Sequence, residues 1–208
     1  MAEEKIISAS IAAEESEQAT EVETSATEKQ ATVAQGLLIV HTGDGKGKTT
    51  AALGLALRAF GGGLRILILQ FIKGSQRYGE LDAIDWLSRV SNGRIEIKQC
   101  GLGFTTQGEK EEHERAAKSA IEMATDALTS GKWDMVILDE INYAVTMNLI
   151  SEEDMLKLVD ARPEKVHLVM TGRQAAQSLI DRADLVTEMK LIKHPFLNGV
   201  YAQLGIEF

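Results

Sequence analysis

The stretch GLLIVHTGDGKGKTT, residues 36–50, decides how the rest of the chain is organised. Four apolar residues lead into a turn rich in glycine, and the turn opens into the helix-favouring run AALGLALRAF. A strand, a glycine turn and a helix start in this order are typical of a loop that cradles phosphate. Glycine lets backbone N–H groups crowd round an anion, and the helix dipole favours negative charge at its N-terminus. The stretch therefore predicts a binding site for a nucleoside triphosphate.

The loop residues expected to bind the nucleotide are Gly43, Asp44, Gly45, Lys46, Gly47, Lys48, Thr49 and Thr50. Lys48 supplies a mobile positive charge, and the Thr49 hydroxyl can bind the Mg²⁺ ion that accompanies a triphosphate. Asp44 would repel phosphate oxygens, so we expect it to point toward a ribose hydroxyl or a backbone donor. The general pattern has glycine where this chain has Thr42, so the prediction depends on the flanking strand and helix. A glycine-rich turn without a ligand is the alternative.

Composition predicts one folded domain preceded by a tail. The chain has 208 residues, of which 44% are hydrophobic and 25% charged, which fits a single domain with an ordinary core. Residues 1–34 hold eight glutamates against two lysines, contain no aromatic residue, and account for most of the formal charge of −9. We expect them to form an acidic, disordered tail. A helix that folds over the nucleotide site is the alternative, and residues 35–208 form the domain.

Charge and cysteine content exclude several classes of function. Residues 35–208 are nearly balanced in charge, so the sequence lacks the basic surface of a nucleic-acid-binding protein. Cys100 is the single cysteine, which excludes an internal disulfide and fits a reducing compartment. No run of about eighteen apolar residues occurs. We therefore expect a soluble, cytoplasmic protein that does not contact a membrane.

Short apolar runs alternate with helix-favouring segments after residue 36. Strands are predicted at residues 37–40, 65–71, 95–99, 135–138, 166–170 and 185–189. Helices are predicted after the glycine loop and at 80–90, 109–129 and 175–183, with a further helix that Ser151 caps and that ends near 161. The alternation predicts a P-loop NTPase-like α/β fold with a mostly parallel central sheet and helices on both faces. Ligands should then bind at the carboxyl ends of the strands.

Two acids end the predicted strand at residues 135–138. Asp139 and Glu140 reach the same sheet edge as the glycine loop, where carboxylates usually hold magnesium. Because side chains alternate along a strand, one acid should face the nucleotide while the other anchors neighbouring backbone. An acidic cap of the next turn is the alternative. Arg173 follows another strand and is placed to sense bound triphosphate, and a structural salt bridge is equally consistent with the sequence.

Four segments resemble one enzyme family. TGDGKGKTTAALGLALRA (42–59), WDMVILDEINYAV (133–145), LVTEMKLIKHPF (185–196) and AQLGIEF (202–208) resemble the ATP:corrinoid adenosyltransferases of the CobA/CobO/BtuR type. The resemblance covers about residues 35–208. It implies that Glu140 is the metal carboxylate with Thr49 as its hydroxyl partner, and that Arg58 contacts the nucleotide. A solvent-exposed arginine near a helix C-terminus is the alternative for Arg58.

The resemblance also assigns a corrinoid loop, CGLGFTTQ at residues 100–107. The family typically has Gly-Phe-Thr-Trp there, and its two aromatic residues help to press the corrinoid into a four-coordinate state by displacing the lower ligand. Phe104 matches this pattern, with an ordinary core residue as the alternative, whereas Thr106 replaces the tryptophan. The replacement puts the efficiency or the preferred corrinoid in question, since a hydroxyl does not exclude water as an indole does.

The implied reaction transfers the 5′-deoxyadenosyl group of ATP to the cobalt(I) of a reduced corrinoid and releases triphosphate, in adenosylcobalamin biosynthesis or salvage. Lys48 and Phe104 would be its catalytic residues, with Mg²⁺ as the cofactor. A flavoprotein reductant and a homodimer are implied as partners. An ordinary P-loop ATPase or kinase, and a non-catalytic nucleotide- or corrinoid-binding regulator, are the alternatives.

Overall fold

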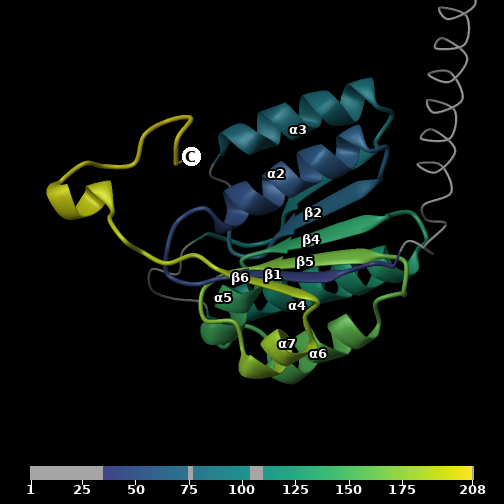
Figure 1. Cartoon of the computed structure of the whole chain (residues 1–208). Coiled ribbons are helices and arrows are strands. Elements are labelled where there is room, and N and C mark those ends of the chain that lie inside the picture. The colour runs from purple at the N-terminus through teal and green to yellow at the C-terminus, as the bar shows by residue number, and fades with distance from the viewer. Residues whose placement is uncertain (1–34, 75–76, 104–109, 208) are drawn as a thin grey trace, which may run out of the picture. The chain divides into compact units, whose positions relative to one another are not determined.

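The computed structural model describes residues 35–74, 77–103 and 110–207, which belong to one compact unit, Gln35–Phe208. One sheet of six strands, in which all paired neighbours are parallel, forms its centre in the order β3-β2-β4-β5-β1-β6 (Figure 1). The strands are β1 (Leu38–Thr42), β2 (Ile66–Gln70), β3 (Ile95–Gln99), β4 (Met135–Asp139), β5 (His167–Thr171) and β6 (Leu185–Glu188). The predicted fold class and the predicted parallel sheet are confirmed.

Helices cover both faces of the sheet (Figure 1). One face packs against α2 (Lys48–Gly61) and α3 (Gly79–Val90). The other packs against α4 (Lys110–Thr129), α5 (Ile141–Thr146), α6 (Glu152–Asp160) and α7 (Gln177–Arg182). A short 3-10 helix, η1 (Pro195–Asn198), lies in the C-terminal segment.

The two hydrophobic cores follow from alternation along the strands. On β1, Leu38 and Val40 belong to the core beneath α4 to α7, whereas Ile39 belongs to the core beneath α2 and α3. All five residues of β1, β2 and β4 are buried, which explains why these strands read as continuous apolar runs. The edge strand β6 is mostly exposed.

Most predicted boundaries lie within one or two residues of the observed ones. Ser151 caps α6 as predicted: its hydroxyl accepts a hydrogen bond from the backbone N–H of Asp154 at 3.0 Å. The helix α5 and the 3-10 helix η1 were not predicted. Each spans only four to six residues, too few for a helical period to show in the sequence.

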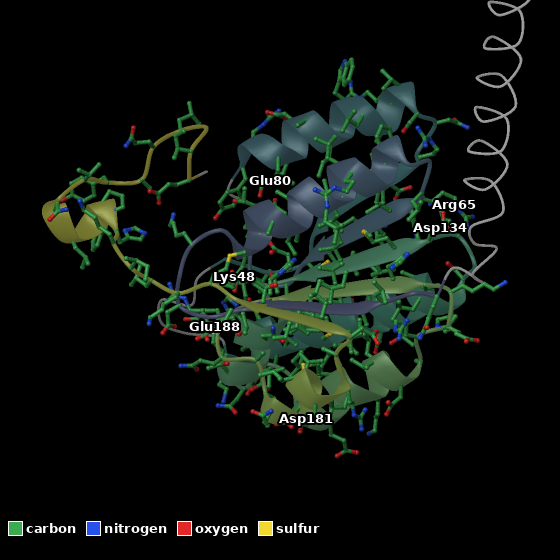
Figure 2. The ribbon with its side chains drawn as sticks, in the orientation of Figure 1. Lys48, Arg65, Glu80, Asp134, Asp181 and Glu188 are labelled. Atoms are coloured by element: carbon green, nitrogen blue, oxygen red, sulfur yellow. The ribbon has the colours of Figure 1, made fainter. Side chains whose placement is uncertain are left out.

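The register brings four strand ends together at one edge. His41 pairs with Thr171 between β1 and β5, and Gln70 pairs with Asp139 between β2 and β4. The residues that follow β1, β2, β4 and β5 therefore meet at the carboxyl edge. At the opposite edge, Arg65 donates hydrogen bonds to Asp134, and Figure 2 shows this pair at the far end of the sheet from Lys48.

Among the described residues, none of the helices has both the length and the apolar character needed to cross a bilayer.

The first prediction tests the central position of β4. Leu138→Ala should lower the free energy of unfolding by about 2–5 kcal/mol, because Leu138 is fully buried in the core beneath α4 to α7. Leu57→Ala is the matched control: Leu57 is 59% exposed on α2, and its loss should cost under about 0.5 kcal/mol. Urea denaturation followed by circular dichroism measures both values, and equal losses would contradict this packing.

Candidate active site

The glycine loop between β1 and α2 has a backbone that requires glycine. Gly43 and Gly47 have φ angles of 94° and 111°, in the left-handed region that side chains disfavour. The N–H of Gly45 donates to the carbonyl of Met189 at 2.6 Å, and a Cβ on Gly45 would lie 2.6 Å from that oxygen. The segment after β6 thus holds the loop closed against the sheet edge.

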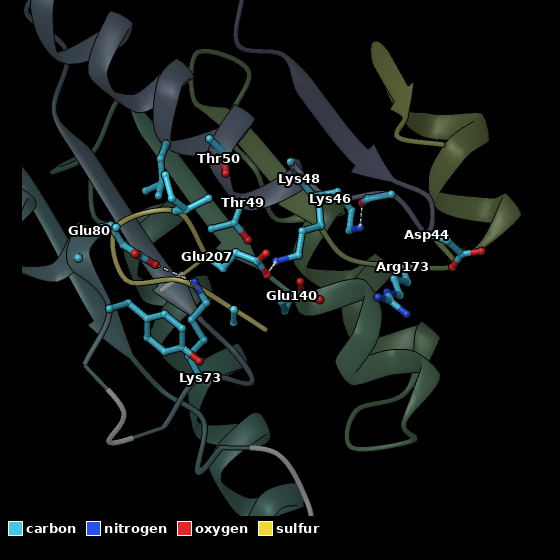
Figure 3. A pocket seen from close by; sticks show the side chains of 18 residues that line it. Asp44, Lys46, Lys48, Thr49, Thr50, Lys73, Glu80, Glu140, Arg173 and Glu207 are labelled. Atoms are coloured by element: carbon cyan, nitrogen blue, oxygen red, sulfur yellow. Dashed lines mark hydrogen bonds and ion pairs between the residues drawn. The ribbon is translucent and has the colours of Figure 1, made fainter. Parts of the chain in front are cut away.

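Lys48 points back into this loop. Its Nζ donates to the carbonyl oxygens of Gly43 and Gly45, each at 2.7 Å, and the residue is only 6% exposed. Burial lowers the pKa of Lys48, while the nearby charge of Glu140 opposes that change. The loop therefore places a partly desolvated ammonium group at the start of α2, where the helix dipole also favours an anion (Figure 3).

Asp139 connects three elements of the site. One of its carboxylate oxygens, Oδ1, accepts hydrogen bonds from the hydroxyls of Thr49 and Thr171, each at 2.8 Å. Its other oxygen, Oδ2, accepts from the amide of Gln70 at 3.3 Å. Asp139 is 1% exposed, so it is a buried anchor. The expectation that one strand-end acid would bind backbone is therefore corrected: Asp139 binds side chains.

Glu140, the next residue, lines the pocket, whereas Asp139 is not among the lining residues. Its φ of 63° turns the chain sharply between β4 and α5, and its N–H donates to the Thr171 hydroxyl at 2.9 Å. Burial raises the pKa of Glu140, and the neighbouring charge of Asp139 raises it further. A cation beside this carboxylate would offset both effects.

The donors here suit magnesium bound together with a nucleotide. No group of three or more His, Cys, Asp or Glu side chains is arranged to hold a metal within residues 35–74, 77–103 and 110–207. Mg²⁺ commonly binds through only one or two protein oxygens, with phosphate and water completing its coordination. The Thr49 hydroxyl and the Glu140 carboxylate are donors of that kind, and Asp139 is close enough to accept from Thr49.

A lysine and an acid at the same edge escaped the sequence analysis. Lys73 follows β2, and its Nζ lies 2.7 Å from Oε1 of Glu80 in the first turn of α3. Burial alone would lower the pKa of Lys73, but Asp139 and Glu80 raise it above its ordinary value. Burial alone would raise the pKa of Glu80, but the hydrogen bond from Lys73 holds it below its ordinary range. Lys73 could have been singled out from the sequence, because it follows a buried strand just as Glu140 does.

The C-terminal segment forms part of the pocket and was also missed. Glu207 accepts a hydrogen bond from Lys46 of the glycine loop, forming an ion pair. Ala202, Gly205 and Ile206 line the pocket beside it. Segments from opposite ends of the domain thus line one open cavity of about 810 Å³, which is large enough for a nucleotide.

Most predicted site residues lie together. Those that line the pocket are Asp44, Gly45, Lys46, Gly47, Lys48, Thr49, Thr50, Glu140 and Arg173. Gly43 lies just behind them and contributes its carbonyl to Lys48. Phe104 and Thr106 fall outside the described residues.

Arg58 is the exception. It lies in the last turn of α2, is exposed, and is not among the residues that line this pocket. Its distance from Thr49 along the helix axis is about 14 Å, given the rise per residue. Arg58 therefore lies away from this pocket, and its contact with the nucleotide stays a prediction.

The fold is that of a P-loop NTPase-like α/β protein, and its glycine loop, Lys48 and the strand-end acid Glu140 line one pocket at the carboxyl edge of the sheet. A family model described as ATP:corrinoid adenosyltransferase BtuR/CobO/CobP matches residues 34–208. The chain belongs to this family, and it is an enzyme that transfers the adenosyl group of ATP to a corrinoid. The resemblance noted in the sequence is confirmed.

Individual relatives agree with the family model. A corrinoid adenosyltransferase of Sinorhizobium sp is 40% identical over 176 residues, covering 84% of this chain and 81% of that protein. The corrinoid adenosyltransferase CobA of Salmonella typhimurium is 37% identical over 180 residues, covering 86% of this chain and 89% of that protein. The flagellar accessory protein FlaH of Methanocaldococcus jannaschii shares the fold alone, with a TM-score of 0.52 and 10% identity over 74% of this chain and 71% of its own.

The second prediction follows from the raised pKa of Glu140. A glutamate whose folded pKa is raised stabilises the fold at low pH and loses that contribution as the pH rises through its folded pKa. Glu140→Gln mimics the protonated form, so it should raise the Tm of the ligand-free protein by a few degrees near about pH 7 and by less near about pH 4.

Glu122→Gln, on an exposed position of α4, is the control and should leave the Tm unchanged at both pH values. Differential scanning calorimetry measures the shifts. A gain from Glu140→Gln that is equal at both pH values would contradict the ionisation argument.

Proposed function

We propose that the cobalt(I) of a reduced corrinoid attacks the 5′-carbon of ATP in this pocket and that triphosphate leaves as one unit. The observation that carries the proposal is the Lys48 ammonium, fixed 2.7 Å from two loop carbonyls at the start of α2. The loop N–H groups, this ammonium and the helix dipole offer stabilisation to the negative charge that develops on the leaving triphosphate.

Cobalt(I) is itself the nucleophile in this reaction, so the protein supplies position and charge rather than a covalent partner. Thr49 and Glu140 would hold Mg²⁺, which when bound would neutralise part of the triphosphate charge. Asp139 would orient the Thr49 hydroxyl for this role, because it accepts a 2.8 Å hydrogen bond from that hydroxyl. Arg173 lines the same pocket and is a further cation available to the triphosphate.

The remaining roles are also proposals. We infer that Phe104 and Thr106 contact the corrinoid and that residues 1–34 lie outside the catalytic domain. A flavoprotein reductant and a cytoplasmic location fit the same reaction, since cobalt(I) must be generated and protected from oxidation. A homodimer is proposed from the family resemblance alone.

The third prediction concerns Lys48. In an anaerobic assay with Mg²⁺, ATP and chemically reduced cobalamin, the wild type should consume the cobalt(I) spectrum and form a light-sensitive alkylcobalt product. Lys48→Ala should lower the rate at least about a hundredfold, because it removes a preorganised charge from the leaving group. Its Tm without ligand should stay within a few degrees, because Lys48 is a buried charge held only by loop carbonyls.

Lys157→Ala, at an exposed position of α6, is the control and should leave the rate unchanged. A Lys48→Ala variant with the wild-type rate would refute the role of this ammonium. Tight ATP binding by the wild type without alkylcobalt would instead favour a binding protein or regulator.

The fourth prediction concerns the threonine at the family's tryptophan position. Thr106→Trp should raise turnover of reduced cobalamin several-fold, because an indole excludes water from the corrinoid better than a hydroxyl does. Thr106→Val separates size from polarity and should give a smaller gain. The rate of alkylcobalt formation decides the matter: unchanged or lower turnover in Thr106→Trp would show that the enzyme does not lack this indole.

A further inference from the structure

Lys73 is a cation in the pocket that has no assigned part in the proposed reaction. It lies in the loop between β2 and α3, with its side chain 16% exposed, and it lines the cavity. Its Nζ is 2.7 Å from Oε1 of Glu80 and 3.6 Å from Oδ2 of Asp139. The same Nζ lies 4.5 Å from the centre of the Tyr78 ring. Two acids and an aromatic face therefore hold one ammonium at the pocket wall.

A second lysine of the chain also lies beside an acid and over an aromatic ring, but it is outside the pocket. Lys132 lies 2.9 Å from a carboxylate oxygen of Glu96 and 4.2 Å from the centre of the Trp133 ring. Its side chain is 56% exposed, and it precedes β4 at the amino edge of the sheet. An ion pair over a ring thus also forms at this protein's surface, away from the pocket. The cluster at Lys73 differs because it is largely desolvated and lines the nucleotide pocket.

The position of Lys73 relative to the glycine loop gives it access to phosphate. Asp139 accepts from the Thr49 hydroxyl with Oδ1 and faces Lys73 with Oδ2, so one carboxylate group separates the ammonium from the loop hydroxyl. A triphosphate held by the loop brings negative charge close to Asp139 and Glu140. Lys73 is a cation that lines the cavity 3.6 Å from Asp139, and Figure 3 shows it on the opposite side of Lys48 from Arg173. Charges this close interact strongly because the site is partly shielded from water.

We propose that Lys73 is a further phosphate-binding residue, whose ammonium binds the triphosphate of ATP and the tripolyphosphate product. Tyr78 and Glu80 act as positioning residues that hold the ammonium at the wall before the ligand arrives. The inference rests on the proposed function in assuming that triphosphate occupies the glycine loop. It assigns the pocket two lysines from different loops, Lys48 after β1 and Lys73 after β2, so that the anion is held from both sides.

The fifth prediction tests this role by binding alone. Isothermal titration calorimetry of the full chain with tripolyphosphate and Mg²⁺ should give a Kd for Lys73→Gln that is weaker than the wild-type value by about tenfold or more, as for loss of a charge-assisted contact. Lys73→Arg, which keeps the charge, should recover most of the affinity. Lys132→Gln removes the matched surface lysine and should leave the Kd unchanged within about twofold.

Two outcomes would overturn the proposal. One is a Lys73→Gln variant that binds tripolyphosphate as tightly as the wild type. The other comes from the wild-type chain and does not depend on any variant folding: amine-labelling of Lys73, measured by mass spectrometry, should fall when tripolyphosphate is present, while labelling of Lys132 stays constant. Equal labelling of Lys73 with and without tripolyphosphate would mean that no phosphate reaches it.

These measurements need no corrinoid, so their result is separable from the proposed reaction. Binding of tripolyphosphate that depends on Lys73, in a protein that forms no alkylcobalt, would count against the reaction and leave the phosphate role standing. Alkylcobalt formation, together with unchanged tripolyphosphate binding by Lys73→Gln, would support the reaction and refute the phosphate role of Lys73.

Discussion

Two hydroxyl groups bound to one carboxylate oxygen hold the nucleotide end of this molecule together. Asp139, at the end of β4, accepts from Thr49 on α2 and from Thr171 on β5 at 2.8 Å each. Because Asp139 and Thr171 are buried, removing this carboxylate would leave the buried Thr171 hydroxyl without its acceptor and would release the Thr49 hydroxyl. The bond to Thr49 fixes the first turn of α2, and with it the loop and Lys48. The geometry of the phosphate site therefore depends on a residue that need not touch phosphate.

Protein groups pair with or hold three of the cations around the pocket. Lys46 pairs with Glu207, Lys48 donates to loop carbonyls, and Lys73 pairs with Glu80. A triphosphate would compete for these contacts rather than meet isolated charges. This arrangement explains how a domain with nearly balanced charge concentrates its attraction for an anion in one cavity, without the wide basic surface that nucleic acids require.

The features that could be predicted from sequence are those set by local chemistry. The apolar runs and the glycine turn determined the strands and the loop, and strand alternation predicted that Asp139 and Glu140 would point different ways. The sequence did not show that Glu140 adopts a φ of 63°, nor that Lys73 reaches across its loop to Glu80, because both depend on tertiary contacts. Arg58 was assigned by resemblance, yet α2 carries it away from the loop.

The most direct test of the central claim is to identify the phosphorus product of a single turnover. Phosphorus-31 NMR of the reaction with reduced cobalamin, Mg²⁺ and ATP distinguishes tripolyphosphate from ADP with inorganic phosphate. Attack at the 5′-carbon, with loop and lysine charges stabilising one leaving group, predicts tripolyphosphate in amounts equal to the alkylcobalt formed. ADP and phosphate appearing in step with turnover would place the attack at the γ-phosphate and contradict the account.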